Sequence, residues 1–212
     1  MAIYVTSDAH GHVRALDEAL SKISLTSDDT LYVLGDMIDR GPDPVGVIKL
    51  VRSLPNARVL KGNHEQIMLD AIIGQDPLDA ETWDINGGWT TRQQLNDMEF
   101  EAYEELVRWM ATLPLYAVVE TDERPYLLVH AGIQTETARA FLLEHGVDCA
   151  DGTGAVDVDR ELLKQMLAVQ SSDDLLWIRH GYWDAPTGLL SAEGKGPVVV
   201  SGHTPTVSLG RY

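Results

Sequence analysis

The chain has 212 residues, of which 44% are apolar and 23% are charged, and its formal net charge at pH 7 is −17. This acidic balance excludes nucleic acid and an anionic membrane as bulk partners, because both are bound mainly through Lys and Arg contacts to phosphate. The single cysteine, Cys149, excludes an internal disulfide and a Cys-cluster metal site.

The composition shows no break along the chain, so we predict one domain that spans residues 1–212. The N-terminal segment Ala2–Thr6 lacks the basic and long apolar regions of a signal peptide, and no stretch is apolar enough to suggest a membrane span. We therefore expect a cytoplasmic protein, with a monomer as the default oligomeric state.

The first third of the chain alternates between strand and helix patterns. Strands are predicted at 2–6, 30–34 and 57–60, and helices at 13–23 and 45–53. This β-α-β-α-β order predicts a largely parallel sheet. Because functional crevices in open α/β sheets lie beyond the carboxyl ends of the strands, residues that follow these strands should converge there.

The remainder predicts further helices and a second, antiparallel portion of sheet. We expect helices at 65–73, 90–96, 100–112, 137–144 and 159–169, an antiparallel strand pair at 115–120 and 126–130, and a last strand at 197–201. Residues 74–88, which end in Asn-Gly-Gly, are expected to form a long excursion, either a lid or a surface cap. Trp83 and Trp89 are expected to be exposed or half-buried. The variable loops at 74–91 and 180–196 would select the substrate.

Polar clusters follow five of the predicted strands. They are Asp8-Ala-His10, Gly35-Asp36-Met-Ile-Asp39-Arg40, Gly62-Asn63-His64-Glu65, His130-Ala-Gly132 and Gly202-His203-Thr-Pro205. Asp, His and Asn ligands without sulfur suit Mn, Fe, Zn or Mg. Two metals about 3.5–4 Å apart can bind a bridging hydroxide and hold the oxygens of an in-line displacement. Asp36, at the end of the central strand, is the natural bridging ligand.

Each cluster also has a purely structural interpretation. Asp8 could cap the helix near Val13, Asn63 could cap a helix that begins at Glu65, and Asp39 and Asp43 could serve the Gly-Pro turn. Five clusters at five strand ends would need five separate explanations of this kind, which favours a shared site. The remaining histidines lack this context and are assigned to the surface or to structure; they are His12, His145 and His180.

In this order, the five clusters resemble the calcineurin-like metallophosphoesterases, and more narrowly the compact bacterial and bacteriophage branch of the phosphoprotein phosphatase family. The segments Trp83…Asn86-Gly-Gly…Thr91 and Leu175–Arg179 are also similar to that branch, so the resemblance covers essentially the whole chain. It implies a four-layer α/β/β/α sandwich with a dinuclear metal site at the carboxyl ends of the strands. The two divalent ions would be Mn²⁺, with Fe or Zn as alternatives.

The resemblance also implies a role for each site residue. The first metal would be held by Asp8, His10 and Asp36, and the second by Asp36, Asn63, His130 and His203. His64 would be the general acid that protonates the leaving oxygen, and Asp39 would orient it. Arg40 and Arg179, together with Asn63, would bind the phosphoryl group; Arg179 could also be only a surface charge.

Two features depart from the family pattern. Ser7 stands where the family commonly has glycine, which we expect to matter little. The chain also ends at Tyr212, soon after His203, whereas the family continues with further strands. We therefore expect either a trimmed chain or a short second sheet.

Three functions follow as hypotheses. The first is a metal-dependent serine/threonine protein phosphatase that acts on phosphoproteins, phosphopeptides and small phosphoesters, with a two-metal-bound hydroxide as nucleophile. The alternative is a symmetrical bis(5'-nucleosyl)-tetraphosphatase, which shares the metal frame but tends to lack the aspartate at the position of Asp39. The third is a non-catalytic metal-bound module whose acidic surface recruits a basic partner.

Overall fold

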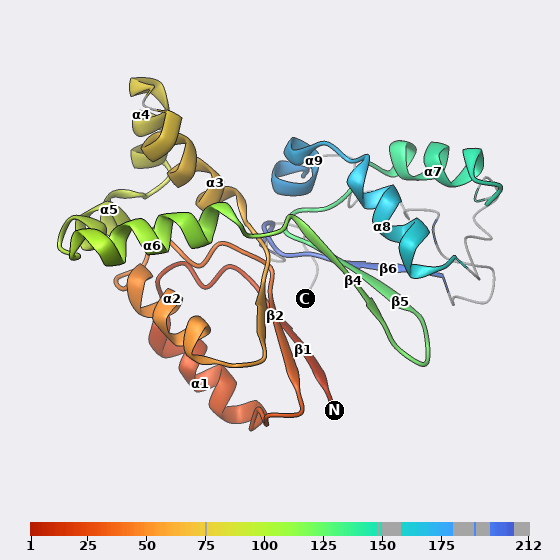
Figure 1. The fold of residues 1–212 in the computed structure, drawn as a ribbon, viewed down its shortest axis with the longest axis horizontal. Coiled ribbons are helices and arrows are strands. Elements are labelled where there is room, and N and C mark those ends of the chain that lie inside the picture. The colour runs from red at the N-terminus through yellow and green to blue at the C-terminus, as the bar shows by residue number, and fades with distance from the viewer. Residues whose placement is uncertain (75, 148, 150–157, 180–188, 190–195, 206–212) are drawn as a thin grey trace. The chain divides into compact units, whose positions relative to one another are not determined.

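The computed structural model describes residues 1–74, 76–147, 149, 158–179, 189 and 196–205. The chain divides into two compact units, Met1–Pro114 and Leu115–Tyr212 (Figure 1). Each unit has its own sheet and its own apolar core. That the two units form one domain stays a prediction.

The first unit is built on a parallel sheet in the order β1-β2-β3. Its strands are β1 (Ile3–Thr6), β2 (Thr30–Val33) and β3 (Ala57–Val59), and both strand pairs are parallel. The connecting helices, α1 (Val13–Ile23) and α2 (Pro44–Ser53), pack side by side along the sheet (Figure 1). The predicted β-α-β-α-β unit is therefore confirmed, and the carboxyl ends of its three strands lie at one edge.

Helix α2 shows how the chain leaves that edge. Asp43 is its N-cap and accepts a hydrogen bond from the backbone N–H of Gly46 at 2.9 Å, and Pro44 occupies the first helical turn. A proline there costs no intrahelical bond, because its missing N–H would have no partner in the helix. Val47 and Val51 then bury against the sheet. Asp43 thus has a capping role.

The rest of the first unit is helical. It contains α3 (Asn63–Leu69), a π-helical turn η1 (Asp70–Gly74), α4 (Pro77–Ile85), α5 (Trp89–Asn96) and α6 (Phe100–Ala111). The expected irregular excursion at 74–88 is wrong, because α4 occupies most of it. Asp76 caps α4 by accepting from the N–H of Leu78 at 2.9 Å, with Pro77 in the first turn. Trp83 is only 3% exposed, against the expectation, whereas Trp89 is 59% exposed.

The second unit carries a mixed sheet in the order β4-β5-β6. The strands β4 (Tyr116–Glu120) and β5 (Pro125–Val129) pair antiparallel, and β6 (Val198–Val200) pairs parallel to β5. The helices are α7 (Thr135–Glu144), α8 (Arg160–Ala168) and α9 (Ser172–Trp177), of which α9 was not predicted. The antiparallel pair and the last strand are as predicted.

Two α/β units of this kind confirm the predicted α/β class; the stacking of the two sheets stays a prediction from the resemblance. Within the described ranges, no helix combines the length and the apolar character needed to cross a membrane.

Candidate active site

Five of the predicted site residues of the first unit share an unusual backbone conformation. Positive φ angles are found at Asp8 (56°), His10 (40°), Asp36 (53°), Asp39 (69°) and Arg40 (63°), and in the second unit at His203 (62°). Side chains rarely tolerate this left-handed region, and residues held there concentrate at functional sites. Among the described residues outside the predicted site, only Ser24, the C-cap of α1, is a non-glycine residue with positive φ.

The loops after β1 and β2 are joined by backbone hydrogen bonds. The N–H of Asp8 donates to the carbonyl of Gly35 at 3.2 Å, and the N–H of His10 donates to the carbonyl of Asp36 at 2.9 Å. As a result, Nε2 of His10 lies 3.5 Å from Oδ2 of Asp36. Two of the three predicted ligands of the first metal are therefore brought together within one unit.

The loop after β3 approaches Asp36 closely. Gly35 has a φ of +94°, and a Cβ atom at this position would collide with the backbone of Gly62. The approach places the carboxylate of Asp36 at the N-terminus of α3, where its Oδ1 accepts the N–H of His64 at 3.1 Å. A helix N-terminus favours negative charge, so this bond helps to hold a buried carboxylate.

His64 lies between two aspartates. Its Nδ1 is 2.6 Å from Oδ2 of Asp39, and its Nε2 is 4.0 Å from Oδ2 of Asp36. Ligand atoms of His10, Asp36 and His64 all lie within 4.8 Å of one another. Because a carboxylate only accepts, the proton of a neutral His64 lies on Nδ1 and the lone pair on Nε2.

Glu65 belongs to this site although we assigned it no role from the sequence. Its carboxylate accepts the backbone N–H groups of Gly62, Asp36 and Met37, each at 2.8 Å. The side chain is fully buried and ties the loop after β3 to the loop after β2. A glutamate three residues after the N-cap Gly62 matches the acidic position of a capping box, which was the available signal.

Burying ionised carboxylates in this site costs free energy unless a cation lies beside them. Burial raises the pKa of Asp36 well above its ordinary value, the neighbouring charge of Glu65 adds to this, and the hydrogen bond from His64 N–H opposes it. Burial likewise raises the pKa of Glu65 against its three backbone bonds. A divalent cation beside Asp36 would offset this desolvation, so the donor set fits a metal.

His10 has the protonation state that a ligand needs. Its Nδ1 lies 2.9 Å from the carbonyl oxygen of Ile38, which can only accept, so the proton lies on Nδ1. Burial lowers the pKa of His10 to about 4, against the opposing bond to Ile38. At neutral pH the imidazole is uncharged, and Nε2, 3.5 Å from Oδ2 of Asp36, carries a lone pair rather than a proton.

Arg40 brings positive charge to the site. Its guanidinium donates to Nε2 of His10 at 2.9 Å and to Nε2 of His64 at 2.8 Å, and its side chain is exposed. Both imidazoles must accept in these bonds because a guanidinium carries no acceptor. An accessible cation thus lies at the solvent side of a group of buried acids.

The second unit brings together its own predicted site residues. Nε2 of His130, after β5, lies 3.2 Å from Nδ1 of His203, after β6, and both side chains are buried. The N–H of Gly202 donates to the carbonyl of His130 at 2.8 Å, which fixes the two loops to each other. Arg179 donates to Oγ1 of Thr204 at 3.2 Å, so this arginine lies next to the loop of His203.

The structure rejects two of the structural alternatives. Helix α1 begins at Val13 with His12 as N-cap, so Asp8 does not cap it. Helix α3 begins at Asn63 with Gly62 as N-cap, so Asn63 does not cap a helix that starts at Glu65. Of the other histidines, His145 contacts Phe141 as a structural residue, whereas His180 and most of the loop 180–196 lie outside the described residues.

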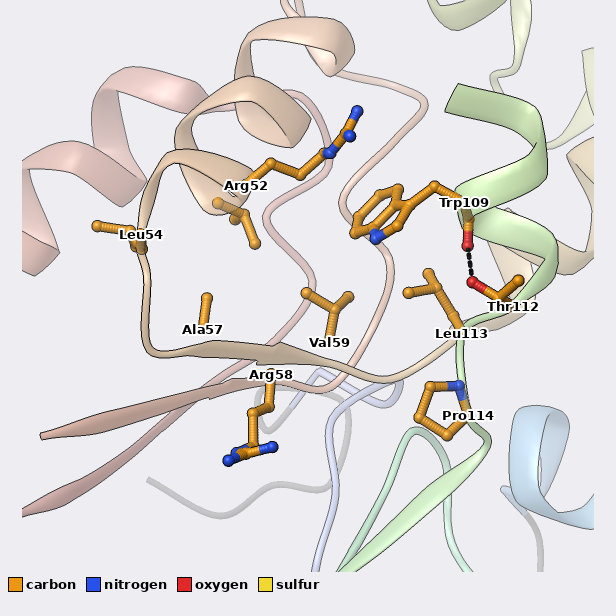
Figure 2. A pocket seen from close by; sticks show the side chains of 10 residues that line it. Arg52, Leu54, Ala57, Arg58, Val59, Trp109, Thr112, Leu113 and Pro114 are labelled. Atoms are coloured by element: carbon orange, nitrogen blue, oxygen red, sulfur yellow. Dashed lines mark hydrogen bonds between the residues drawn. The ribbon is translucent and has the colours of Figure 1, made fainter. Parts of the chain in front are cut away.

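A separate cavity of about 480 Å³ lies elsewhere in the first unit (Figure 2). It is formed by the end of α2, strand β3 and the end of α6, and none of the predicted site residues lines it. The guanidinium of Arg52 there is already paired with the carboxylate of Glu105, with Nη2 2.5 Å from Oε1. Its Cζ atom lies 5.2 Å from the ring centre of Trp109. The side chains of Arg58 and Val59 project from opposite faces of β3 (Figure 2).

The protein is an α/β protein with a candidate metal site, because a buried aspartate lies between two imidazoles beyond the strand ends of its parallel sheet. The model of the calcineurin-like phosphoesterase family matches residues 1–211, and the chain belongs to that family. The resemblance to the metallophosphoesterases, and with it the predicted metallophosphatase fold, is confirmed.

Among curated proteins, the chain is similar to symmetrical bis(5'-nucleosyl)-tetraphosphatases. A symmetrical bis(5'-nucleosyl)-tetraphosphatase from Erwinia tasmaniensis is 32% identical over 136 residues, which cover 63% of this chain and 45% of that protein. The protein of the same name from Salmonella paratyphi C is 30% identical over 158 residues, 74% of this chain and 50% of that protein. The chain thus spans about half the length of the curated relatives it matches.

A solved serine/threonine protein phosphatase from Saccharomyces cerevisiae is also similar, with a TM-score of 0.48 and 20% identity over 64% of this chain and 39% of that chain. The narrower resemblance to the phosphoprotein phosphatase branch is not confirmed, because the curated relatives above carry the other name.

Proposed function

We propose that this protein is a metal-dependent hydrolase of phosphoric esters or anhydrides in which His64 is the general acid. The observation that carries the proposal is the 2.6 Å contact between Nδ1 of His64 and Oδ2 of Asp39 inside a buried site. An acid of this kind protonates the leaving oxygen, a contribution typically worth 10²–10⁴ in rate.

The metals would be held as the family resemblance implies. Asp8, His10 and Asp36 are the proposed ligands of one ion, and Asp36, Asn63, His130 and His203 those of the other. Mn²⁺ is the proposed ion, with Fe or Zn as alternatives, since such ligands discriminate poorly between metals. Bound, the two ions would supply an activated water and would neutralise the phosphoryl charge.

The chain's own residues prepare the transfer of a proton. Asp39 holds the Nδ1 proton of His64 and would stabilise the imidazolium, so Nε2 is the atom that delivers the proton to the leaving oxygen. Arg40 contacts Nε2 in this structure. An anionic phosphoryl group would attract the guanidinium away from Nε2, because bidentate contacts to phosphate are stronger than a contact to a neutral imidazole.

Arg40 and Arg179 are the proposed phosphoryl clamps. In a protein with a formal net charge of −17, an anionic substrate needs local cations. Arg40 is exposed beside His10 and His64, and Arg179 lies beside the loop that carries His203. Asn63, at the start of α3, is proposed both as a metal ligand and as a substrate contact.

The names of the relatives support a dinucleoside tetraphosphate as substrate better than the phosphoprotein we first expected. We therefore place symmetrical cleavage of a dinucleoside tetraphosphate first. A serine/threonine phosphomonoester remains the second candidate, and Asp39 is the observation that favours it, because tetraphosphatases tend to lack an aspartate at this position.

A substrate panel decides between the candidates. The protein is treated with a chelator, Mn²⁺ is restored, and turnover is measured on diadenosine tetraphosphate, a phosphoserine peptide and an aryl phosphate. A kcat/KM on diadenosine tetraphosphate well above the other values, with two nucleoside diphosphates as products, supports the first candidate, and a higher value on the phosphopeptide supports the second. Bound metal with no hydrolysis of any substrate would contradict both and favour the non-catalytic module.

A further inference from the structure

Asp39 is held by more partners than a simple pair with His64 requires. Its side chain is completely buried, and besides His64 its carboxylate contacts Thr91 and Trp83. Both lie in the segment Trp83–Thr91, from the end of α4 to the start of α5. This segment overlaps the stretch 74–88, which the sequence suggested was a lid or a surface cap. The segment instead makes contact with the residue that orients the proposed acid.

Thr91 fixes the backbone and the carboxylate of Asp39 together. Its Oγ1 accepts the N–H of Asp39 at 2.9 Å and lies 2.6 Å from Oδ1 of the same residue. Because the N–H can only donate, the hydroxyl proton is directed to the carboxylate. The hydroxyl of the fully buried Thr91 therefore holds both the backbone N–H and the carboxylate of Asp39, a residue whose φ is 69°.

Trp83 completes the shell around the same carboxylate. Its Nε1–H donates to Oδ1 of Asp39 at 3.0 Å and lies 3.2 Å from Oδ2. The indole is buried, so the ring also excludes water from this side. With Thr91 and Trp83 donating to Oδ1, Oδ2 is directed to Nδ1 of His64, which fixes the rotation of the carboxylate.

The same segment also holds Arg40. The carbonyl of Gly87 accepts the N–H of Arg40 at 3.0 Å. Gly87 has a φ of +96°, and a Cβ atom there would lie 2.9 Å from Cγ of Arg40. Only a residue without a side chain allows this approach, so the Asn-Gly-Gly turn is shaped to the arginine.

We propose that Trp83 and Thr91 are positioning residues, which orient His64 through Asp39 and so set the efficiency of proton transfer to the leaving oxygen. The proposal rests on the proposed function, because it takes His64 as the general acid. It assigns the segment Trp83–Thr91 to the catalytic machinery rather than to a lid.

The test compares leaving groups, because a misplaced acid matters only where the leaving oxygen is basic. The variants Thr91→Val and Trp83→Phe each remove one donor to Asp39 and retain most of the side-chain volume. The matched control is Thr91→Ser, which keeps the hydroxyl. Each protein is loaded with Mn²⁺, and kcat and KM are measured on 4-nitrophenyl phosphate, whose leaving group is weakly basic, and on an alkyl phosphate.

We expect kcat on the alkyl phosphate to fall roughly tenfold or more in Thr91→Val and Trp83→Phe, with less than about a threefold change on 4-nitrophenyl phosphate. KM and the amount of bound manganese should stay near the parent values. The Thr91→Ser variant should hydrolyse the alkyl phosphate much faster than Thr91→Val, because it keeps the hydroxyl. In a His64→Ala background, Thr91→Val should have no further effect, since residues that act as a unit are not additive.

Equal losses on both substrates, or no loss on either, would overturn the proposal. If His64→Ala itself shows no dependence on the leaving group, the proposed function fails as well. If His64→Ala shows that dependence and the two positioning variants do not, only the inference about Trp83 and Thr91 fails. Should Trp83→Phe not fold, Thr91→Val and Thr91→Ser decide the outcome by themselves.

Discussion

The carboxylate of Glu65 accepts the backbone N–H of Asp36 at 2.8 Å, although both residues carry buried carboxylates that lie close together in space. The same glutamate binds the N–H groups of Gly62 and Met37, so it joins the two loops that carry the central site residues. The fold therefore uses one buried acid to position another.

Replacing Glu65 with Gln should destabilise the first unit. One carboxylate oxygen becomes an amide NH₂ group, which cannot accept a backbone N–H, so at least one buried donor loses its partner at a cost of about 1–3 kcal/mol. Urea unfolding measures the change as a lower midpoint. The control is Glu104→Gln, at an exposed position of α6. A shift no larger than that of the control would show that the three bonds contribute little.

Replacing Asp36 with Asn should weaken metal binding without destabilising the metal-free protein. The amide oxygen can still accept the N–H of His64, whereas the cost of burying a charge is removed. We expect the metal-free variant to melt at the same temperature as the parent or higher. Mn²⁺ at about 100-fold above its Kd should add about 3 kcal/mol of stability to the parent and little to the variant.

Thermal melts of both proteins with a chelator and with Mn²⁺ measure this difference, and Asp97→Asn, an exposed residue after α5, is the control. An equal gain from Mn²⁺ in Asp36→Asn and in the parent would remove Asp36 from the proposed ligands.

Replacing Arg40 with Lys should weaken substrate binding while the protein stays folded. A lysine keeps the charge but cannot contact a phosphoryl group through a bidentate fork, so we expect KM to rise roughly tenfold. Steady-state kinetics on the preferred substrate measures KM. The control, Arg58→Lys, changes an exposed arginine on β3 outside the predicted site and should leave KM unchanged. Similar KM values in both variants would argue against the clamp.

Replacing Asp29 with Asn should lower stability in a pH-dependent way. Its carboxylate accepts the N–H of Ala2 at 2.6 Å and the hydroxyl of Thr26 at 2.7 Å, and the bond from Ala2, followed by the bonds from Thr26, lowers the pKa of Asp29. A lowered pKa gives stability that is present above the unfolded value near 3.9 and is lost as pH falls through the folded value.

We therefore expect Asp29→Asn to melt below the parent at pH 7, with a difference that narrows as the pH falls below the unfolded value near 3.9. Melting temperatures of both proteins across this range test the expectation, with the exposed neighbour in Asp28→Asn as control. A difference independent of pH would mean that the charge of Asp29 has no part in it.

Much of the fold is readable from local pattern. Strands at β1, β2 and β3 and helices at α1 and α2 follow from short apolar runs and helical spacing, and their ends agree with the prediction to within one or two residues. The expected excursion at 74–88 failed because Pro and Gly were taken as signs of irregular structure. Asp76-Pro77 instead begins α4, since a capping aspartate followed by proline is also a helix start.

The sequence by itself determined which chemical groups stand at the strand ends, because strand patterns and the residues that follow them are local properties. Tertiary structure decided which groups touch. The contacts of Glu65 with Asp36, and of Trp83 and Thr91 with Asp39, join residues that lie 29 to 52 positions apart along the chain. Such contacts depend on how loops pack around a buried charge, and no local pattern encodes that packing.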